Sequence, residues 1–187
     1  MKTKRLILAA MALVLFSFTT VKAQKNIVRI SPLGFAKFKA KVHYERTLSD
    51  RFSAGLIGNY MFGVYNGVRI EPYARFYVQG TAPAGLYVQG KYHFSHMTLS
   101  KGTVLAGWAM PSGYNFSEMG GSLGVGYQVL FGKDKNFAFD IYSGYRFSSL
   151  GYTRDIVSSS FDDAAKDGYR LLHVNSFDLG ISLGYKF

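Results

Sequence analysis

The feature of this chain that most limits its fold is an alternation of apolar and polar residues with a period of two. Between residues 68 and 79, valine, isoleucine, alanine and phenylalanine alternate with arginine, glutamate, tyrosine and glutamine. The same alternation covers residues 37–45, 86–95, 122–131, 137–148 and 177–187. A period of two places alternate side chains on opposite faces of a β-strand, so the pattern predicts strands rather than amphipathic helices.

Turn residues between these segments divide the chain into eight expected strands. Their ranges are 26–33, 37–47, 52–64, 68–79, 84–96, 118–131, 136–149 and 173–187. We expect a turn at Gly34–Phe35 after the first strand and a tight hairpin at Asn66-Gly67 after the third. Short turns follow the second, fourth and sixth strands, and long connections are expected at residues 97–117 and 150–172.

Alternation alone leaves open which face of the strands is outside. Aromatic residues make up 17% of the chain and gather near both ends of the expected strands. One group is Tyr44, Phe52, Phe76, Phe131, Phe137, Tyr185 and Phe187, and the other is Tyr60, Phe62, Phe94, Phe147 and Phe177. Two aromatic girdles around an aliphatic band are typical of transmembrane barrels. We therefore predict an all-β fold, an eight-stranded antiparallel transmembrane up-and-down β-barrel with periplasmic N- and C-termini.

The first residues resemble an export signal rather than part of this fold. Lys2, Lys4 and Arg5 precede an apolar run of 13 residues, Leu6–Phe18, which is too short for the roughly 20 residues of a membrane-spanning helix. The run is followed by small residues at the −3 and −1 positions of a cleavage site after Ala23. We expect residues 1–23 to be a signal peptide and residues 24–187 to form the barrel, placed in the outer membrane of a Gram-negative cell envelope.

The net charge and the cysteine content limit which partners and covalent links are expected. The formal net charge is +11, and the region after the signal stays basic. Because an exported protein seldom meets nucleic acid, we expect outer-membrane lipid and lipopolysaccharide phosphates, or an extracellular or envelope protein, as partners, and no nucleic acid. The chain has no cysteine, so neither a disulfide nor a lipid-modified N-terminal cysteine is expected.

Two short motifs carry a family resemblance. The chain ends in Gly184-Tyr185-Lys186-Phe187, and Tyr185 and Phe187 resemble the signal that the barrel-assembly machinery reads during biogenesis. Ser31-Pro32-Leu33-Gly34, with Tyr44-Glu45-Arg46 before a turn, is similar to a large family of small outer-membrane barrels. The broader resemblance is to eight-stranded barrels of the OmpA/OmpX/OmpW type. Known members of that group anchor the cell wall, bind partners through loops or pass small apolar molecules.

The polar face of each expected strand would point into the lumen of such a barrel, and it carries large charged residues. The expected charge network comprises Lys41, Glu45, Arg69, Glu71, Arg75, Lys91, Asp140, Arg146 and Asp178, and Lys39 shares their parity. Because charges removed from water need partners, we expect these residues to pair, with Glu71 near Lys91 and Arg146 near Asp178. The alternative use of such a lumen is a narrow channel for small solutes.

One pair of residues raises an enzymatic alternative. His93 and Ser95 lie two apart on one strand face, as in lipid A deacylases among eight-stranded barrels, and Glu71 is a candidate to orient the histidine. Their parity points into the lumen, however, and the sequence reads His93-Phe94-Ser95-His96 where that family has His-x-Ser-Asn. There is no metal-ligand spacing, phosphate loop or nucleophile elbow, so we expect no catalytic residue, metal or cofactor.

The long connections hold the remaining candidates for binding. Exposed aromatic residues among glycines are typical of contact surfaces, although they equally suit a loop folded over its own barrel. The candidate binding residues are Trp108, Tyr114, Phe116, Arg154 and Asp155. The first hypothesis is therefore a non-enzymatic outer-membrane barrel that acts as a structural or interaction module through its two long loops. A lipid A-modifying enzyme and a narrow channel are the alternatives.

Overall fold

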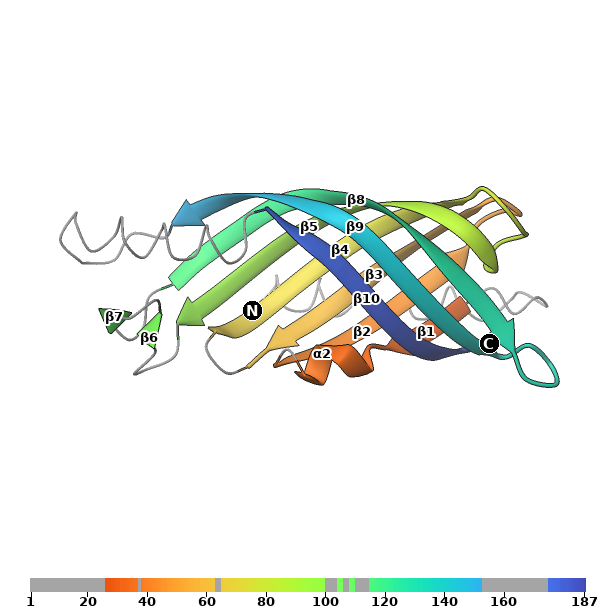
Figure 1. Cartoon of the computed structure of the whole chain (residues 1–187), viewed down its shortest axis with the longest axis horizontal. Coiled ribbons are helices and arrows are strands. Elements are labelled where there is room, and N and C mark those ends of the chain that lie inside the picture. Colours follow the sequence, from red (N-terminus) through yellow and green to blue (C-terminus); the bar gives the residue numbers. More distant parts are fainter. Residues whose placement is uncertain are drawn as a thin grey trace, which may run out of the picture.

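The chain folds into a closed barrel of eight antiparallel strands (Figure 1). The computed structural model describes residues 26–36, 38–62, 65–99, 104–105, 108–109, 115–152 and 175–187. The barrel strands are β1 (Asn26–Ile30), β2 (Lys39–Thr47), β3 (Phe52–Met61), β4 (Tyr65–Tyr77), β5 (Gly85–Leu99), β8 (Asn115–Phe131), β9 (Phe137–Tyr152) and β10 (Asn175–Lys186). Each strand pairs with its neighbours along the chain, and β1 pairs with β10 to close the barrel.

The two ends of the barrel differ. At the turn end, short connections join β2 to β3, β4 to β5 and β8 to β9, and β1 begins where β10 finishes. At the loop end, β5 and β8 are joined by residues 100–114, which include the small hairpin β6 (Val104–Leu105) and β7 (Trp108–Ala109). Residues 153–174 join β9 to β10 at the same end. The expected eight strands and up-and-down order are confirmed.

Several expected boundaries were wrong. Asn66-Gly67 is not a tight hairpin, because both residues lie in β4, where Gly67 pairs with Met61 on one side and Met97 on the other. The long connections are shorter than 97–117 and 150–172, because β5, β8 and β9 each include three more residues at that end. These added residues carry Met97, Phe116 and Leu150 at sequence positions where the rest of each strand is polar, so the alternation gives little contrast there.

The largest departure lies after β1. The first strand stops at Ile30, and a short helix, α2 (Pro32–Ala36), replaces the expected turn at Gly34–Phe35. Pro32 fits the first helical position, where the backbone N–H that proline lacks would have no helical partner. Gly34 faces β2 so closely that a Cβ there would lie 2.6 Å from the carbonyl oxygen of Lys39. The helix therefore lies where a longer β1 would otherwise continue the wall (Figure 1).

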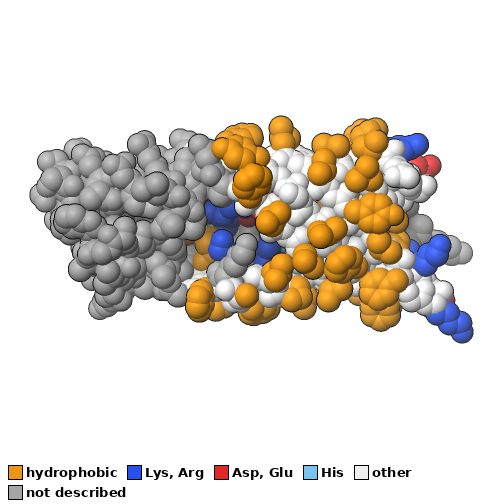
Figure 2. Space-filling view, in the orientation of Figure 1, with side chains coloured by type: hydrophobic (Ala, Val, Ile, Leu, Met, Phe, Trp, Pro, Cys, Tyr) orange, Lys and Arg blue, Asp and Glu red, His pale blue; other side chains and the backbone are white. Residues whose placement is uncertain are grey.

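Apolar side chains cover the outside of the barrel (Figure 2). Outward residues such as Leu56, Ile70, Val125 and Ile141 are each about half exposed. Aromatic rings gather toward the turn end, where Phe52 and Phe76, Phe131 and Phe137, and Phe137 and Tyr185 lie 5.0–5.8 Å apart. A second group, nearer the loop end, includes Phe38, Tyr60, Phe62, Tyr145 and Phe177. The alternation alone did not say which face of the strands is outside; the structure shows that the apolar face is outside.

The inside of the barrel is polar. Its buried side chains include arginines, acids, glutamines and tyrosines, and each of the eight strands contributes at least one buried polar residue. Glycines on the lumen parity leave room for the tyrosines: the Tyr87 hydroxyl lies over Gly126, and the Tyr142 hydroxyl over Gly144. Within the described ranges, no helix is long and apolar enough to cross a membrane.

Candidate functional site

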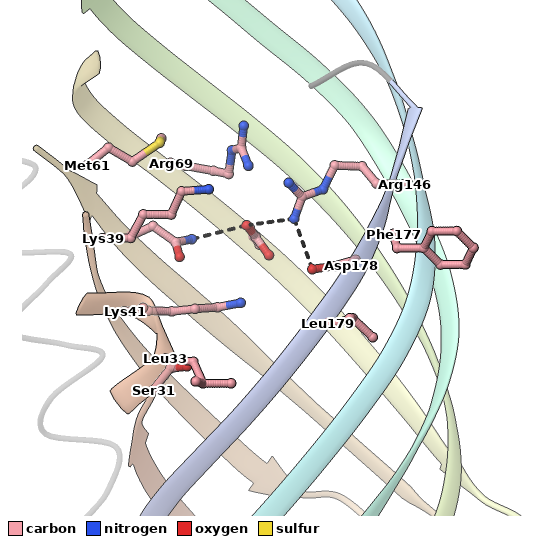
Figure 3. Close-up of a pocket in the computed structure, with 13 residues that line it drawn as sticks. Ser31, Leu33, Lys39, Lys41, Met61, Arg69, Arg146, Phe177, Asp178 and Leu179 are labelled. Atoms are coloured by element: carbon pink, nitrogen blue, oxygen red, sulfur yellow. Dashed lines mark hydrogen bonds and ion pairs between the residues drawn. The ribbon is translucent and has the colours of Figure 1, made fainter. Parts of the chain in front are cut away.

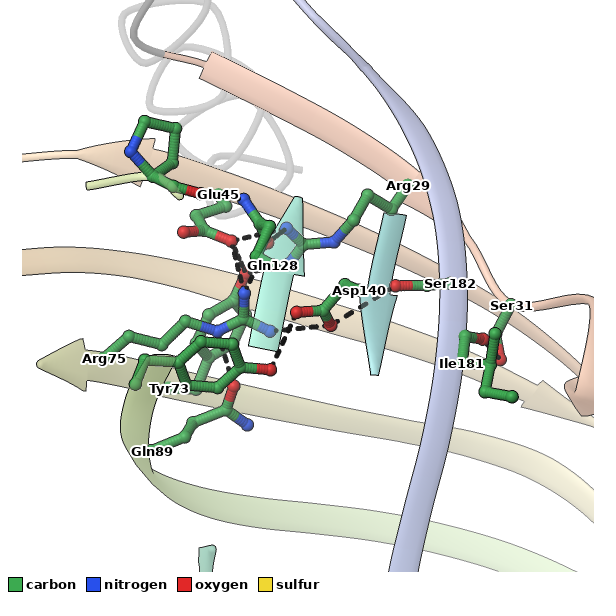
Figure 4. Close-up of polar contacts among 12 residues, drawn as sticks. Arg29, Ser31, Glu45, Tyr73, Arg75, Gln89, Gln128, Asp140, Ile181 and Ser182 are labelled. Carbon is green, nitrogen blue, oxygen red and sulfur yellow. Dashed lines mark hydrogen bonds and ion pairs between the residues drawn. The ribbon is translucent and has the colours of Figure 1, made fainter. Parts of the chain in front are cut away.

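The lumen near the turn end is filled by a network centred on two arginines and two acids (Figure 4). Arg29 Nη1 lies 2.6 Å from Glu45 Oε2, and Arg75 Nη1 lies 2.9 Å from the same oxygen. Arg75 Nη2 reaches Asp140 Oδ2 at 3.1 Å. Both arginines also donate to the side-chain oxygen of Gln128. We call Arg29, Glu45, Arg75, Gln128 and Asp140 the turn-end network.

Further side chains satisfy this network from around the wall. Tyr77 donates its hydroxyl to Glu45 at 2.8 Å, Tyr87 donates to Asp140 at 2.7 Å, and Ser53 donates to Glu45 at 2.6 Å. Arg75 donates through Nε to Gln89 at 2.6 Å, and its guanidinium lies 4.0 Å from the centre of the Tyr87 ring. Because every charge has an opposite charge and hydrogen bonds, this part of the lumen meets the conditions for a stable buried ionic cluster.

A second group lies midway along the lumen. Lys91 reaches Glu71 at 3.6 Å and makes a close ion pair with Asp178. Arg146 lies 3.2 Å from Asp178 and 3.7 Å from Glu71, and Asn59 donates to Glu71 at 3.1 Å. The structure therefore brings Glu71 to Lys91, and Arg146 to Asp178, in the pairings expected from the strand order. A small pocket between this group and the turn-end network, lined by Lys91, Arg75 and Asp140 among others, has a volume of about 10 Å³, room for about one water molecule.

A third group, toward the loop end, contains the histidine considered for catalysis. His93 Nε2 lies 3.1 Å from Glu118 Oε1 and 3.0 Å from the hydroxyl of Ser148. Ser95 contacts Glu118 only at 3.4–3.5 Å, while Arg69 makes an ion pair with Glu118 at 2.6 Å. The prediction that Glu71 orients His93 was wrong, because the carboxylate beside His93 is that of Glu118.

This arrangement differs from a catalytic triad. A triad uses one imidazole nitrogen for the nucleophile and the other for the carboxylate. Here a single nitrogen, Nε2 of His93, faces both Ser148 and Glu118. The geometry is that of a shared polar cluster in which arginine and histidine together satisfy one buried acid.

A cavity of about 270 Å³ opens beside the second and third groups (Figure 3). Its charged lining consists of Lys39, Lys41, Arg69, Glu71, Arg146 and Asp178. Its remaining lining consists of Ser31, Leu33, Gly34, Asn59, Met61, Phe177 and Leu179. Four basic side chains thus face two acids, in contrast to the turn-end network, where two arginines face two acids.

The two lysines account for this excess of positive charge. Each described acid of the lumen lies within 4 Å of at least one arginine or lysine, but neither Lys39 nor Lys41 makes an ion pair with a described residue. Figure 3 shows both side chains reaching from β2 toward Arg146 and Asp178 on the other side of the cavity. Pairing was expected for Lys41, and in the described part of the chain its ammonium has no such partner.

The remaining predicted residues lie elsewhere. Tyr185 and Phe187 lie at the outer surface of the turn end, and the backbone of Phe187 exchanges hydrogen bonds of 2.9 and 3.1 Å with Asn26 across the closure of the barrel. Trp108 in β7 and Phe116 in β8 are described by their backbone only. Tyr114, Arg154, Asp155 and the expected signal peptide 1–23 lie outside the described residues.

Sequence reasoning missed two central members of these clusters. Arg29 was absent from the expected network because the first strand was too short for its parity to be read, although Val28 and Ile30 on either side face outward. Glu118 lies on the same face of β8 as Ser122 and Gln128, and this face points into the lumen. Extending the alternation of β8 toward its start would have found it.

In the described part of the chain, no group of three or more histidines, cysteines or acids is placed to hold a metal ion. Comparison of the chain with protein-family models, with curated proteins and with solved structures gives no match.

Proposed function

We propose that this protein is an integral outer-membrane barrel, exported by a signal peptide, that acts without catalysis as a structural or interaction module at its loop end. The observation that carries the proposal is the inverted arrangement of its side chains. Half-exposed leucine, valine and isoleucine side chains surround a lumen of paired charges. A surface of this kind is costly in water and favourable in a bilayer.

The orientation follows from the two ends. Outer-membrane barrels have short periplasmic turns and longer extracellular loops. Three short connections, the start of β1 and the end of β10 lie at one end of this barrel, and the two longest connections lie at the other. The turn end is accordingly periplasmic in the proposal, and residues 100–114 and 153–174 face the outside of the cell.

The turn-end network argues against steady conduction. Its side chains come from opposite sides of the wall and meet in the middle of the lumen, where Glu45 and Arg75 are almost fully buried. An eight-stranded barrel is just wide enough for its interior side chains to fill it. Contact with partners is therefore assigned to the loop end, where the cavity and the long connections lie.

The test is reconstitution of the protein in planar lipid bilayers and vesicles. We expect heat-modifiable gel mobility after insertion and no steady conductance. A variant with residues 101–114 and 154–170 replaced by tight turns is expected to insert equally well and to lose partners captured from intact outer membranes by the full chain. A loop-less barrel that keeps those partners, or steady conductance of the full chain, would contradict the proposal.

A further inference from the structure

The wall of the barrel is interrupted beside the cavity. Strand β1 pairs with β10 only as far as Ile30 and Leu183, and β2 pairs with β1 only from Val42 onward. Beyond that point, residues 175–182 of β10 pair with β9 but with no described strand on their other side. Ser31 bridges the start of the gap by donating its hydroxyl to the carbonyl oxygen of Ile181 at 2.7 Å.

The cavity reaches the outer surface through this interruption. Asp178 points into the lumen, whereas its neighbours Phe177 and Leu179 point outward and are 79% and 58% exposed. All three nevertheless line the same cavity. Figure 2 shows the result from outside, as a hollow in which basic and acidic side chains are visible between apolar ones. A molecule beside the barrel wall therefore has a lateral path to the charged lining.

The lining selects for an anion. Lys39 and Lys41 have no ion pair with a described residue, and Nε of the buried Arg69 has no hydrogen-bond partner among the described residues. Arginine and lysine side chains that converge on one space suit a phosphate group, which accepts hydrogen bonds on several oxygens and carries the opposite charge. The volume of about 270 Å³ exceeds the need of a water molecule and suits a small phosphorylated group.

The rim of the cavity indicates what carries that group. Leu33 on α2 and Phe177 and Leu179 on β10 are exposed apolar side chains beside the opening. A free ion would gain nothing from them, whereas hydrocarbon chains would pack against them outside the wall. We propose that this cavity binds the phosphate group of an anionic lipid, which enters through the gap between β10 and α2 while its acyl chains stay on the outer surface.

This inference deepens the proposed function and rests on it, because lateral access by a lipid supposes a barrel that lies in a bilayer. The lysines then serve binding rather than folding. Unpaired charges in the lumen lower the stability of the protein without ligand, and an anion compensates for them when it binds. Replacing both lysines is therefore expected to weaken binding and to stabilise the unliganded barrel.

The experiment compares the purified protein with the double variant Lys39→Gln/Lys41→Gln in neutral detergent micelles. The lipid probes are phosphatidic acid and diacylglycerol, which share acyl chains and differ in the phosphate group, and native mass spectrometry counts the bound molecules. A second arm titrates inorganic phosphate and follows the ³¹P resonance. The matched control is Lys133→Gln/Lys135→Gln, which removes two positive charges at the exposed turn that joins β8 to β9.

We expect phosphatidic acid to bind and diacylglycerol not to bind. The double variant should lose affinity about tenfold or more for each lysine, and the control should keep it. The double variant should also need more denaturant to unfold without ligand. Equal binding by variant and parent, binding of both lipids alike, or a double variant that is less stable or unfolded would overturn the inference.

The second arm separates the two sources of phosphate. Binding of phosphatidic acid, with or without inorganic phosphate, supports the lipid, and binding of inorganic phosphate alone overturns it. The two proposals also fail separately. A barrel that inserts into vesicles but binds no phosphatidic acid removes only this inference. A protein that binds phosphatidic acid in micelles but never inserts into vesicles removes the proposed membrane location.

Discussion

Glu45 is the carboxylate on which side chains from three strands converge. It accepts from Arg29 of β1, Ser53 of β3, and Arg75 and Tyr77 of β4, and it is fully buried. In such a cluster, the attraction between opposite charges offsets the large cost of removing them from water only while all partners are present. The stability of the turn end therefore depends on this one negative charge.

Replacing Glu45 with glutamine keeps the shape of the side chain and removes its charge. We predict that Glu45→Gln lowers the free energy of unfolding by about 3–5 kcal/mol, because Arg29 then has no acid beside it. Denaturant unfolding of the refolded barrel measures the change. The matched control is Asp134→Asn at an exposed turn, where a change within about 0.5 kcal/mol is expected. Equal effects of the two substitutions would refute a structural role for the network.

Glycine at position 126 is required by Tyr87, its paired neighbour on the adjacent strand β5. A Cβ at this position would overlap the hydroxyl of Tyr87 and lie 2.6 Å from the carbonyl oxygen of Ile141. We predict that Gly126→Ala costs about 1–3 kcal/mol through overpacking. Gly180→Ala is the control, since no atom lies within 4 Å of a Cβ there, and it should be neutral or slightly stabilising. If Gly180→Ala destabilises the barrel as much in the same unfolding measurement, close packing by Tyr87 is not the reason for glycine at position 126.

At the scale of elements, the sequence was informative where side chains alternate and uninformative where they do not. The inward and outward faces of β4, β5, β8 and β9 were predicted correctly, because polar residues or glycines alternate there with large apolar ones. The helix α2 was missed, since five residues with one glycine and one proline carry no periodicity. The cavity was missed for the same reason. Part of its lining comes from Ser31, Leu33 and Gly34, at and beside α2, which follows the short strand β1.

The depth of the apolar face is testable on single strands. We predict that Val125→Arg, in the middle of β8, costs about 2–4 kcal/mol on insertion into vesicles, whereas Val78→Arg, just beyond β4 at the turn end, costs about 0–1 kcal/mol. Both valines are about half exposed, so the substitutions differ mainly in depth. Gln128→Ser would be unsuitable as a polar control, because Gln128 bonds Arg29, Arg75 and the carbonyl oxygen of Pro83. Equal costs at Val125 and Val78 would contradict a bilayer around the apolar outer surface of the barrel.

At the scale of the whole molecule, the barrel divides its length between two tasks. The half toward the turn end is filled by paired charges under an apolar surface, and for this reason the proposal expects it not to conduct. The half toward the loop end holds a cavity with excess positive charge, an interrupted wall and the long connections. The cavity and the other features suited to binding therefore lie at the loop end.

The central claim is that the exposed apolar face lies against lipid, and single-tryptophan fluorescence in vesicles tests it most directly. Trp108 is the only tryptophan, so Trp108→Phe provides a silent background in which Val125→Trp and Lys133→Trp each report one position. We predict that lipids brominated near the middle of their acyl chains quench the tryptophan at 125 strongly, while the tryptophan at 133 responds instead to aqueous acrylamide. Tryptophan at 125 that is quenched by acrylamide and ignored by brominated lipid would contradict the membrane barrel.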